Sequence, residues 1–506
     1  MTHYLAIDIG TESARAAVFT ADGARIGDGH GPYATTYPRP GWAEQNPADW
    51  WAGAVSASRA ALAQAGIDRV AGVSVATTSS SVVFLDSEGR PLRPALLWMD
   101  SRSSAEAERT AQSDHPALAF SGGSDSSEWL VPKAMWVARN EPQVYADSRF
   151  IGESVDYLTW KLTGRWVGSR LNATCKWNYD SRTGDVPSDL YAELGIADLG
   201  NKLPRDILAV GSLAGALSSR AADELGLSGT APVGVGGIDA HLSLIPLKGA
   251  ARNPVSVVAG TSNAFIAELE EPLFSPTIWG PYPRALSELW LVEGGQVSAG
   301  SALTWLAERV LGCARDQLPA LATDAAAVAP AGHGLLVLDN FMGNRTPLRD
   351  PKLRGAILGL QLGTTQAELY RAAVESVAYG TRQVLESFQA VGVDTSTVVL
   401  SGGIRHNPLW LQVTADVLGR AVAIVEGENL TLLACAAIAA AAANGTDVTI
   451  EAAAFAPTMR TIEPTRGSAA VYDEAFALYV DTVAATTEAS HRLVAMTAPR
   501  SMEPVK

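Results

Sequence analysis

The stretch that decides the fold is residues 6–19, which read Ala6-Ile7-Asp8-Ile9-Gly10-Thr11-Glu12-Ser13-Ala14-Arg15-Ala16-Ala17-Val18-Phe19. The pattern predicts an apolar strand that ends near Asp8, a tight polar turn and a second strand. Gly10 lets the backbone turn closely, and Thr11, Glu12 and Ser13 offer polar atoms at the bend. Such a turn can hold phosphate, and the carboxylate of Asp8 can hold Mg²⁺. Taken alone, the stretch is equally typical of a β-hairpin with a polar tip.

The composition is that of a globular chain of 506 residues, long enough for two large domains or three smaller ones. Hydrophobic residues make up 47% and charged residues 18%, which is enough apolar material for sizeable cores. The net charge of −15 argues against a nucleic-acid partner, because phosphate backbones are bound by basic surfaces. A site for an anionic phosphate must therefore be built locally, from backbone dipoles, a metal and a few cations.

The cysteines and the apolar runs predict a cytoplasmic protein with no membrane partner. Cys175, Cys313 and Cys435 lie far apart and form no Cys-x-x-Cys or Cys/His cluster, which argues against structural zinc. So few cysteines in so long a chain suit a reducing compartment. The first residues lack the apolar core of a signal peptide. The longest apolar run, Leu432–Ala443, is too short to span a bilayer and predicts a buried helix.

A second acidic residue follows an apolar strand near the middle of the chain. Residues 231–241 read Ala-Pro-Val-Gly-Val-Gly-Gly-Ile-Asp-Ala-His, and we expect a helix from Ala240. Glycine permits close approach of a substrate, and a helix N-terminus supports negative charge, so Asp239 is placed for acid–base chemistry. The simpler interpretation is that Asp239 caps the helix.

The pattern of the opening stretch recurs in the second half of the chain. Residues 255–267 again read as strand, turn and strand, with Gly260-Thr261-Ser262 at the turn. A repeated supersecondary unit indicates internal duplication. Two facing turns of this kind could hold a polyphosphate from both sides.

Two polar stretches in the first half suit a polyhydroxylated ligand. Residues 77–81 are five consecutive hydroxyl residues, Thr-Thr-Ser-Ser-Ser, at a strand end, although a plain polar turn would look the same. Trp98, Asp100 and Arg102 follow an apolar strand and offer a ring and a carboxylate to a sugar, unless Asp100 only caps a helix. Lys176 is a possible phosphate or sugar contact.

Helical spacing predicts further elements. We expect one helix over residues 150–163, others over 302–311, 365–391, 409–418 and 430–443, and a last helix with a weakly ordered tail over the final 35 or so residues. A strand over 398–400 leads into Ser-Gly-Gly-Ile-Arg-His-Asn, where the glycines allow a nucleobase or ribose to lie against the backbone. The alternation of strands and helices predicts an α/β fold.

Four stretches together resemble the FGGY carbohydrate kinases, a branch of the actin, Hsp70 and sugar-kinase superfamily. They are Asp8-Ile9-Gly10-Thr11-Glu12-Ser13, Gly236-Gly237-Ile238-Asp239-Ala240, Gly260-Thr261-Ser262 and Gly402-Gly403-Ile404-Arg405-His406-Asn407. Their order and spacing extend over nearly the whole chain. The resemblance implies two RNase H-like α/β domains around a central ATP and sugar cleft, a sugar-binding domain over residues 1–250 and a nucleotide-binding domain over 251–506.

The resemblance also implies roles for single residues. Asp239 would be the catalytic base, and Asp8 and Asp239 would lie at a Mg²⁺ ion. Because phosphoryl transfer passes through a loose transition state, the Asp239 carboxylate need not have an elevated pKa. ATP would be held by residues of two phosphate turns, a ribose glycine and an adenosine pocket, namely Gly10, Thr11, Glu12, Ser13, Gly260, Thr261, Ser262, Gly300, Gly402, Gly403 and Asn407.

The sugar is less closely defined by the resemblance. Residues 78–81 match neither the Arg-Glu pair of glycerol kinases nor the Gln-Met-His-Gly stretch usual in xylulokinases. Residues 76–81, 97–102, 175–179 and 343–348 look closer to the ribulokinases, and the last two stretches particularly resemble the D-ribulokinase and ribitol-kinase-like group. We therefore expect phosphorylation of the 5-hydroxyl of D-ribulose. The candidate substrate contacts are Ser80, Trp98, Asp100, Glu128, Lys176 and Asp239.

Several alternatives stay open at this point. L-ribulose, ribitol, xylulose and erythritol are other possible substrates of a kinase with these motifs. A non-catalytic sugar or ATP sensor is a further alternative, which the presence of both Asp8 and Asp239 disfavours. A homodimer is the default expectation for a cytoplasmic enzyme.

Overall fold

The computed structural model describes residues 1–332 and 334–497 and divides the chain into two compact units. The first unit contains Met1–Pro254, Ile266–Val292 and Gly427–Thr458. The second contains Val255–Phe265, Glu293–Glu426 and the described residues from Met459 onward. The boundary that we expect near residue 250 treats each domain as one continuous stretch of the chain. The return of two later segments to the first unit has no visible sign in the sequence pattern.

The first unit is built on a six-stranded sheet in the order β11-β12-β5-β1-β2-β3. Its strands are β1 (His3–Ile9), β2 (Ser13–Thr20), β3 (Arg25–Pro32), β5 (Gly72–Thr77), β11 (Leu213–Ala216) and β12 (Pro232–Gly234). β1 pairs antiparallel with β2 and parallel with β5, which confirms the strand, turn and strand expected from the opening stretch. β12 runs parallel to β5, so the chain after β12 leaves the sheet at the same edge as the turn after β1.

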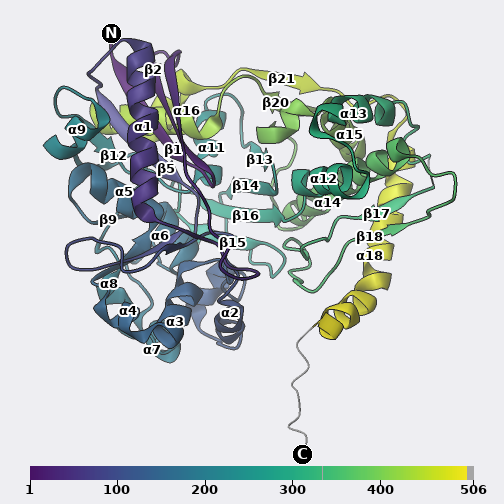
Figure 1. The fold of residues 1–506 in the computed structure, drawn as a ribbon, viewed down its shortest axis with the longest axis horizontal. Helices are drawn as coiled ribbons and strands as arrows, with labels where there is room; N and C mark the ends of the chain where they lie inside the picture. The colour runs from purple at the N-terminus through teal and green to yellow at the C-terminus, as the bar shows by residue number, and fades with distance from the viewer. Residues whose placement is uncertain (333, 498–506) are drawn as a thin grey trace, which may run out of the picture. The chain divides into compact units, whose positions relative to one another are not determined.

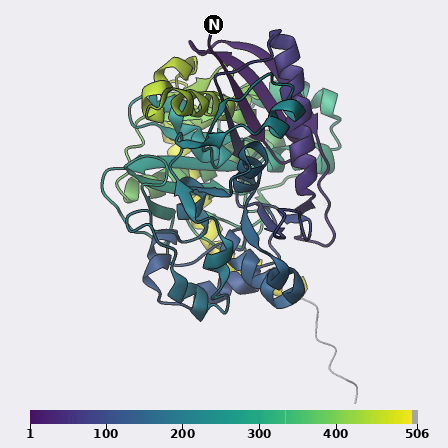
Figure 2. The same ribbon diagram turned by 90° about the vertical axis from the view of Figure 1, so that its left-hand side faces the viewer.

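One helix packs on each face of this sheet, with the purple strands between the two helices in Figure 2. The first is α1 (Pro47–Ala65), which packs on β2 and β3, and the second is α16 (Leu430–Asn444), which packs on β1, β5 and β12. Glycines of strands β5 and β12 allow α16 to approach the sheet closely. A Cβ on Gly72 would lie 2.3 Å from the Ala439 carbonyl oxygen, and a Cβ on Gly234 would lie 2.7 Å from that of Ile438. The run predicted as a buried helix is therefore a core helix of the first unit.

The rest of the first unit surrounds a four-stranded sheet, in the order β4-β7-β6-β8, and a β9–β10 pair. These strands are β4 (Glu44–Gln45), β6 (Val82–Leu85), β7 (Ala95–Leu96), β8 (Phe150–Glu153), β9 (Val167–Ser169) and β10 (Asp206–Leu208). The helices are α2 (Ser104–Thr110), η1 (Pro116–Ser121), α3 (Leu130–Asn140), α4 (Pro142–Asp147), α5 (Ser154–Thr163), α6 (Arg170–Lys176), α7 (Ser188–Glu193), α8 (Leu199–Lys202), α9 (Ser219–Leu225), α10 (Asp239–Leu242), α11 (Leu244–Lys248), α17 (Val448–Glu451) and η5 (Ala452–Phe455).

A second sheet has seven strands in the order β15-β16-β14-β13-β19-β20-β21. They are β13 (Val255–Ala259), β14 (Asn263–Leu269), β15 (Trp279–Pro283), β16 (Trp290–Gln296), β19 (Val398–Ser401), β20 (Val422–Val425) and β21 (Met459–Ile462). β13, β19 and β20 run parallel and β21 antiparallel, as β1, β5, β12 and β11 do in the first sheet. The shared strand order agrees with the duplication that the sequence indicates.

The helices of the second unit are α12 (Gly300–Trp305), a π-helical turn η2 (Leu306–Val310), η3 (Arg315–Gln317), α13 (Leu318–Ala326), α14 (Gln366–Ala390), η4 (Gly402–His406), α15 (Pro408–Leu418) and α18 (Ala469–Thr497), and β17 (Leu336–Leu338) pairs with β18 (Ala356–Leu358) (Figure 1). α14 and α15 match the predicted helices closely. The helix predicted over 150–163 is confirmed from Ser154 onward as α5, but its first part is wrong, because residues 150–153 pair with β6 as β8. The predicted tail, residues 498–506, lies outside the described residues.

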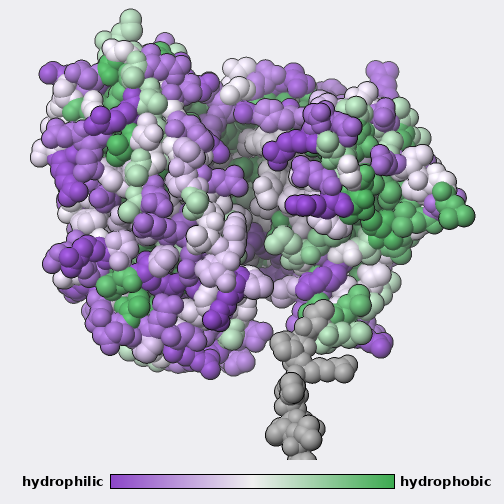
Figure 3. Space-filling model, in the orientation of Figure 1, coloured by the Kyte–Doolittle hydropathy of each residue, from purple (hydrophilic) through white to green (hydrophobic). Residues whose placement is uncertain are grey.

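Exposed hydrophobic side chains gather on the second unit beside β17 and β18 (Figure 3). Leu358, Leu360 and Leu362 contribute to this surface. Over residues 1–332 and 334–497, no helix is both long enough and apolar enough to cross a membrane.

Candidate functional site

Asp8 lies at the end of the central strand β1, and its side chain is almost completely buried. The carboxylate accepts hydrogen bonds from Arg15 Nη1 at 3.2 Å and from Asn429 Nδ2 at 3.3 Å. Arg15 is its cross-strand neighbour on β2, whereas Asn429 comes from the segment that returns to the first unit before α16. Burial raises the pKa of Asp8, and the charge of Arg15 opposes this rise.

Asp239 is the first residue of α10, and its side chain is partly exposed. One carboxylate oxygen accepts the backbone N–H of Ala240 at 2.7 Å. Desolvation and, second to it, the negative charge of Asp8 raise the pKa of Asp239 to about 7. The sequence-based argument does not require an elevated pKa for this carboxylate, but the structure gives it one, because two acids share one poorly solvated region.

The glycines before Asp239 have a different role from the one predicted. A Cβ on Gly236 would lie 1.8 Å from the carbonyl oxygen of Val75, and one on Gly237 would lie 2.8 Å from a side-chain carbon of Leu171. The absent side chains therefore make room for strand β5 and helix α6 rather than for a substrate. Their effect is to let the segment that delivers Asp239 lie against the sheet, where Thr77 and Ile238 form a parallel bridge.

Asp8 and Asp239 are the residues that could hold a divalent cation. Mg²⁺ binds oxygen ligands, commonly one or two carboxylates together with water and substrate phosphates, and it would offset the repulsion between these two acids. The donor set fits Mg²⁺ in this sense. A site made wholly of protein ligands is not present in the described chain, where no three His, Cys, Asp or Glu side chains are placed to hold a metal.

The first polar turn is closed by a hydrogen bond from Gly10 N–H to the carbonyl of Ser13 at 3.0 Å. Thr11 is held from outside the turn, because Trp98 Nε1 donates to its hydroxyl at 3.1 Å and Gln45 Nε2 to its carbonyl at 2.6 Å. Of the predicted phosphate contacts here, Glu12 is exposed, Gly10 and Thr11 are partly exposed, and Ser13 is buried at the start of β2. Trp98, predicted as a sugar contact, donates its indole N–H to this turn.

The second polar turn is closed in a similar way, by Gly260 N–H to the carbonyl of Ser262 at 3.0 Å. The predicted ribose glycine lies directly beside it: Gly300 N–H donates to the Gly260 carbonyl at 2.9 Å, and a Cβ on Gly300 would lie 2.5 Å from that oxygen. Thr261 is exposed, and its carbonyl accepts the N–H and the hydroxyl of Ser301. The start of α12 is therefore fastened to this turn.

The predicted adenosine residues lie next to the same turn. Gly402 has a φ of +85°, and a Cβ there would lie 2.8 Å from the carbonyl of Ala259, so the position requires glycine. Gly403 is exposed and has ordinary clearance. Asn407 caps α15 by accepting the N–H of Trp410 at 3.1 Å, and its amide donates to the hydroxyl of Tyr370. The second unit thus brings the second turn, Gly300, Gly402 and Gly403 together, with Asn407 at the end of η4.

Ser80, a predicted substrate contact, is 1% exposed, and its hydroxyl donates to the carboxylate of Glu153. Its carbonyl accepts Lys133 Nζ at 2.7 Å, and the same ammonium donates to the carbonyl of Leu97 at 2.6 Å. Burial lowers the pKa of Lys133 to about 8 and raises that of Glu153. Ser80 is therefore an internal residue of a buried polar cluster, and the contact with sugar gains no support from its position.

The remaining predicted sugar contacts differ in their burial and in the groups that surround them. Asp100 is fully buried, and its carboxylate accepts the N–H of Ala43 together with the backbone and guanidinium N–H groups of Arg102. It begins no helix, since α2 starts at Ser104. Lys176 is buried with Nζ 4.7 Å from the ring centre of Trp129, and it lowers the pKa of Glu153. Glu128 is partly exposed, and its charge acts on Lys133.

Sequence reasoning missed the charged centre of this cluster, Glu153 and Lys133. Lys133 lies between apolar residues in the first half of α3, a pattern that indicates a buried partner. Glu153 follows an apolar stretch and was included in a single predicted helix, although the glycine before it is typical of a strand end. Asn172 of α6, which donates to the hydroxyl of Ser79 at 3.2 Å, carried no recognisable signal.

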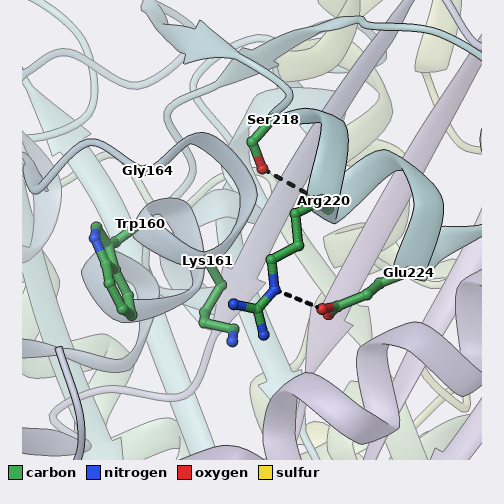
Figure 4. A pocket seen from close by; sticks show the side chains of 7 residues that line it. Trp160, Lys161, Gly164, Ser218, Arg220 and Glu224 are labelled. Atoms are coloured by element: carbon green, nitrogen blue, oxygen red, sulfur yellow. Dashed lines mark hydrogen bonds and ion pairs between the residues drawn. The ribbon is translucent and has the colours of Figure 1, made fainter. Parts of the chain in front are cut away.

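A cavity of about 180 Å³ lies elsewhere on the first unit, lined by Trp160, Lys161, Gly164, Ser218, Arg220, Ala221 and Glu224 (Figure 4). Arg220 forms an ion pair with Glu224 at 2.8 Å. None of the predicted site residues lines this cavity. It therefore does not define the candidate site.

The structure has two α/β units and two sheets that share a strand order, and its first unit places two carboxylates near a glycine turn. Two family models extend over most of the chain, the N-terminal domain of the FGGY family of carbohydrate kinases over residues 3–246 and the C-terminal domain over residues 255–443. The chain belongs to the FGGY family of carbohydrate kinases. It is an ATP-dependent sugar kinase, as the four motifs predict.

Individual relatives agree with this assignment. A ribulokinase from Mycolicibacterium smegmatis is 32% identical, with 95% of this chain and 93% of the relative covered. An FGGY carbohydrate kinase domain-containing protein from Xenopus laevis is 30% identical over 88% of this chain and 89% of its own. The crystal structure of a xylulose kinase from Rhodospirillum rubrum superposes with a TM-score of 0.85 at 28% identity, covering 97% of this chain and 100% of that one.

Proposed function

We propose that this kinase transfers the γ-phosphoryl group of ATP to a terminal hydroxyl of a five-carbon sugar or polyol, with Asp239 as the general base. One observation carries the assignment of the base: Asp239 is partly exposed beside Asp8, and its pKa is raised to about 7. A carboxylate with that pKa is about half ionised at neutral pH, and its ionised form is basic enough to accept a proton from the attacking hydroxyl.

The other residues of the proposal bind and position. Backbone N–H groups of the Gly10 turn would contact phosphate oxygens, while Trp98 and Gln45 hold Thr11 in place. The Gly260 turn, Gly300, Gly402 and Gly403 would bind the nucleotide. Mg²⁺ held by Asp8 and Asp239 would supply charge neutralisation at the phosphate oxygens.

D-ribulose, phosphorylated at its 5-hydroxyl, is the substrate that we favour. Support comes from the ribulokinase of M. smegmatis, at 32% identity over 95% of this chain, and from the hydroxyl-rich turn at residues 77–81. Xylulose is the second candidate, because a xylulose kinase shares the fold at 28% identity. L-ribulose, ribitol and erythritol differ from these in stereochemistry or length and belong in the same test. We also propose a cytoplasmic homodimer, which sedimentation and fractionation would check.

The test is ATP turnover, followed as ADP release, across a panel of pentuloses, pentitols, tetritols and glycerol. The Asp239→Asn variant is measured beside the wild type, with Glu224→Gln at the remote cavity as the matched acid-to-amide control. Strong preference for D-ribulose, lost in Asp239→Asn and kept in Glu224→Gln, would support the proposal. Preference for another sugar would overturn the substrate alone. ATP binding without turnover on any sugar would move the function to a sensor.

A further inference from the structure

Donors from the chain after β3 and from β4 take up the carbonyl groups of the first polar turn. Tyr33 follows β3 directly, and its hydroxyl donates to the carbonyl of Gly10 at 2.5 Å. Its backbone N–H donates to the carbonyl of Glu12 at 3.1 Å. The carbonyl between them, that of Thr11, accepts Gln45 Nε2 at 2.6 Å. Three successive carbonyls of the turn are therefore each held by a donor.

The two side-chain donors are fixed in that role. The buried Gln45 amide accepts the indole N–H of Trp50 at 2.6 Å through Oε1, and because an indole can only donate, the NH₂ end must face the turn. Burial, followed by the negative charges of Asp8 and Asp239, raises the pKa of the Tyr33 hydroxyl above its usual value. Tyr33 therefore keeps its proton and remains a donor at neutral pH.

Holding the carbonyls also sets the direction of the N–H groups. In a trans peptide the C=O and the N–H point to opposite sides, so the N–H of Thr11 is opposed to the Gly10 carbonyl and that of Glu12 to the Thr11 carbonyl. Both N–H groups are thus directed away from Tyr33 and Gln45. Within the part of the chain that the structure describes, neither donates to a protein acceptor, and both residues are at least partly exposed. Successive free N–H groups of this kind suit an anion.

The turn lies beside the pair of acids. Gly10 follows Asp8 by two residues, and the charges of Asp8 and Asp239 both act on Tyr33. A phosphate group at these N–H groups is therefore near the proposed base, which is where the transferred phosphoryl group must be. Donors aimed at the charge that develops there lower the barrier to transfer, and they do so only when their direction is fixed beforehand.

We propose that Tyr33 is a positioning residue for phosphoryl transfer, which holds two carbonyls of the first turn so that the N–H groups of Thr11 and Glu12 are aimed at the phosphoryl group in transit. This inference rests on the proposed kinase function and adds a residue that lies outside the four family motifs. Without the Tyr33 hydroxyl the N–H groups remain but lose their fixed direction. The rate of transfer should therefore fall more than the affinity for either substrate.

Tyr33→Phe tests the role of the hydroxyl, because it keeps the ring. We expect kcat to fall about tenfold, with the KM for ATP and the KM for the preferred sugar each within about threefold of wild type. Tyr145→Phe is the matched control, since it loses a hydrogen bond to Asp198 in a different hydrophobic cluster, and it should keep kcat within about twofold. Thermal melting checks that both variants are folded. An unchanged kcat in Tyr33→Phe, or an equal loss in Tyr145→Phe, would overturn the proposal.

Sulfur in place of an oxygen on the γ-phosphoryl group tests whether the effect reaches that group. Sulfur is a weaker hydrogen-bond acceptor than oxygen, so the kcat with ATPγS should fall further below that with ATP when the N–H groups are correctly aimed. The ratio of the two kcat values should therefore be at least about threefold smaller in Tyr33→Phe than in wild type. Equal ratios in the two proteins would show that the hydroxyl acts elsewhere and would overturn the proposal.

A binding measurement separates this proposal from the proposed function. If wild type turns over no sugar, the proposed function fails, and the probe becomes ADP with aluminium fluoride and magnesium, an analogue of the phosphoryl group in transit. Calorimetry should show this analogue bound at least about fivefold more tightly by wild type than by Tyr33→Phe, while ADP alone binds both equally. Equal binding of the analogue by both proteins, or none by either, would overturn the role of Tyr33.

Discussion

Two groups of buried acids in the first unit differ in how their charge is balanced. Around Glu153, two serine hydroxyls and the charges of Lys133 and Lys176 surround one carboxylate. At Asp8 and Asp239, two carboxylates repel each other, and the cation beside them, Arg15, has half of its side chain in solvent. The first arrangement is complete within the protein. The second leaves negative charge uncompensated at a partly exposed position, as expected where a cation or a substrate proton is to be bound.

Removal of the proton acceptor should have the largest effect. We expect Asp239→Asn to lower kcat about 10²–10⁴-fold, the range typical of a general base, because the amide cannot accept the hydroxyl proton. Initial rates at saturating ATP and sugar measure this loss. A variant whose kcat stays within fivefold of the wild-type value would show that Asp239 is not the base. It would also remove the contrast between the Asp8–Asp239 pair and the group around Glu153.

Removal of the Lys133 cation from the group around Glu153 should lower the stability of the protein. Lys133→Met should lower the free energy of unfolding by about 3–5 kcal/mol, because it leaves two buried carbonyls without their donor and removes a positive charge that acts on the buried Glu153 carboxylate. Lys161→Met, at the partly exposed cavity of Figure 4, should cost less than about 1 kcal/mol. Urea unfolding at pH 7 measures both variants. Equal, small losses of unfolding free energy in the two variants would mean that Lys133 does not stabilise the turn at residues 78–81.

The difference between the two groups also explains what the sequence could predict. Asp8, Asp239 and the glycine turns follow apolar strands, so local pattern and family motifs locate them, and the two-domain α/β fold follows from the same stretches. Glu153, Lys133 and Asn172 come from β8, α3 and α6, and only tertiary packing brings them together. For the same reason the sequence could not show that Ser80 is enclosed, since burial of one serine of a run depends on neighbours far along the chain.

The raised pKa of Asp239 should appear in the pH dependence of catalysis. The base must be ionised, so log kcat/KM for the sugar should rise with a slope of about one below pH 7 and level off above it. Glu224→Gln should keep this profile. A flat profile from pH 5.5 to pH 8 would mean that the acid is ionised throughout, and that Asp8 and Asp239 are as well compensated as Glu153.

The smallest expected effect is a change in stability with pH, and its sign is opposite to that of a typical ion-paired carboxylate. The pKa of Asp239 is about 7 in the folded protein and near 3.8 in an unfolded chain, so the folded state binds the proton more tightly. Ionisation of the carboxylate therefore does not lower the free energy of unfolding below about pH 4, lowers it more as the pH rises, and has its full effect above about pH 7.

Asp239→Asn removes this loss of stability. It should match wild type near pH 4 and be more stable by about 1–2 kcal/mol at pH 8, a figure reduced to allow for the partial exposure of the side chain. Urea unfolding of both proteins across this range measures the difference, with Glu224→Gln as the control that should not show it. A variant less stable than wild type at pH 8 would mean that Asp239 is stabilised by its surroundings, and the contrast with Glu153 would then be lost.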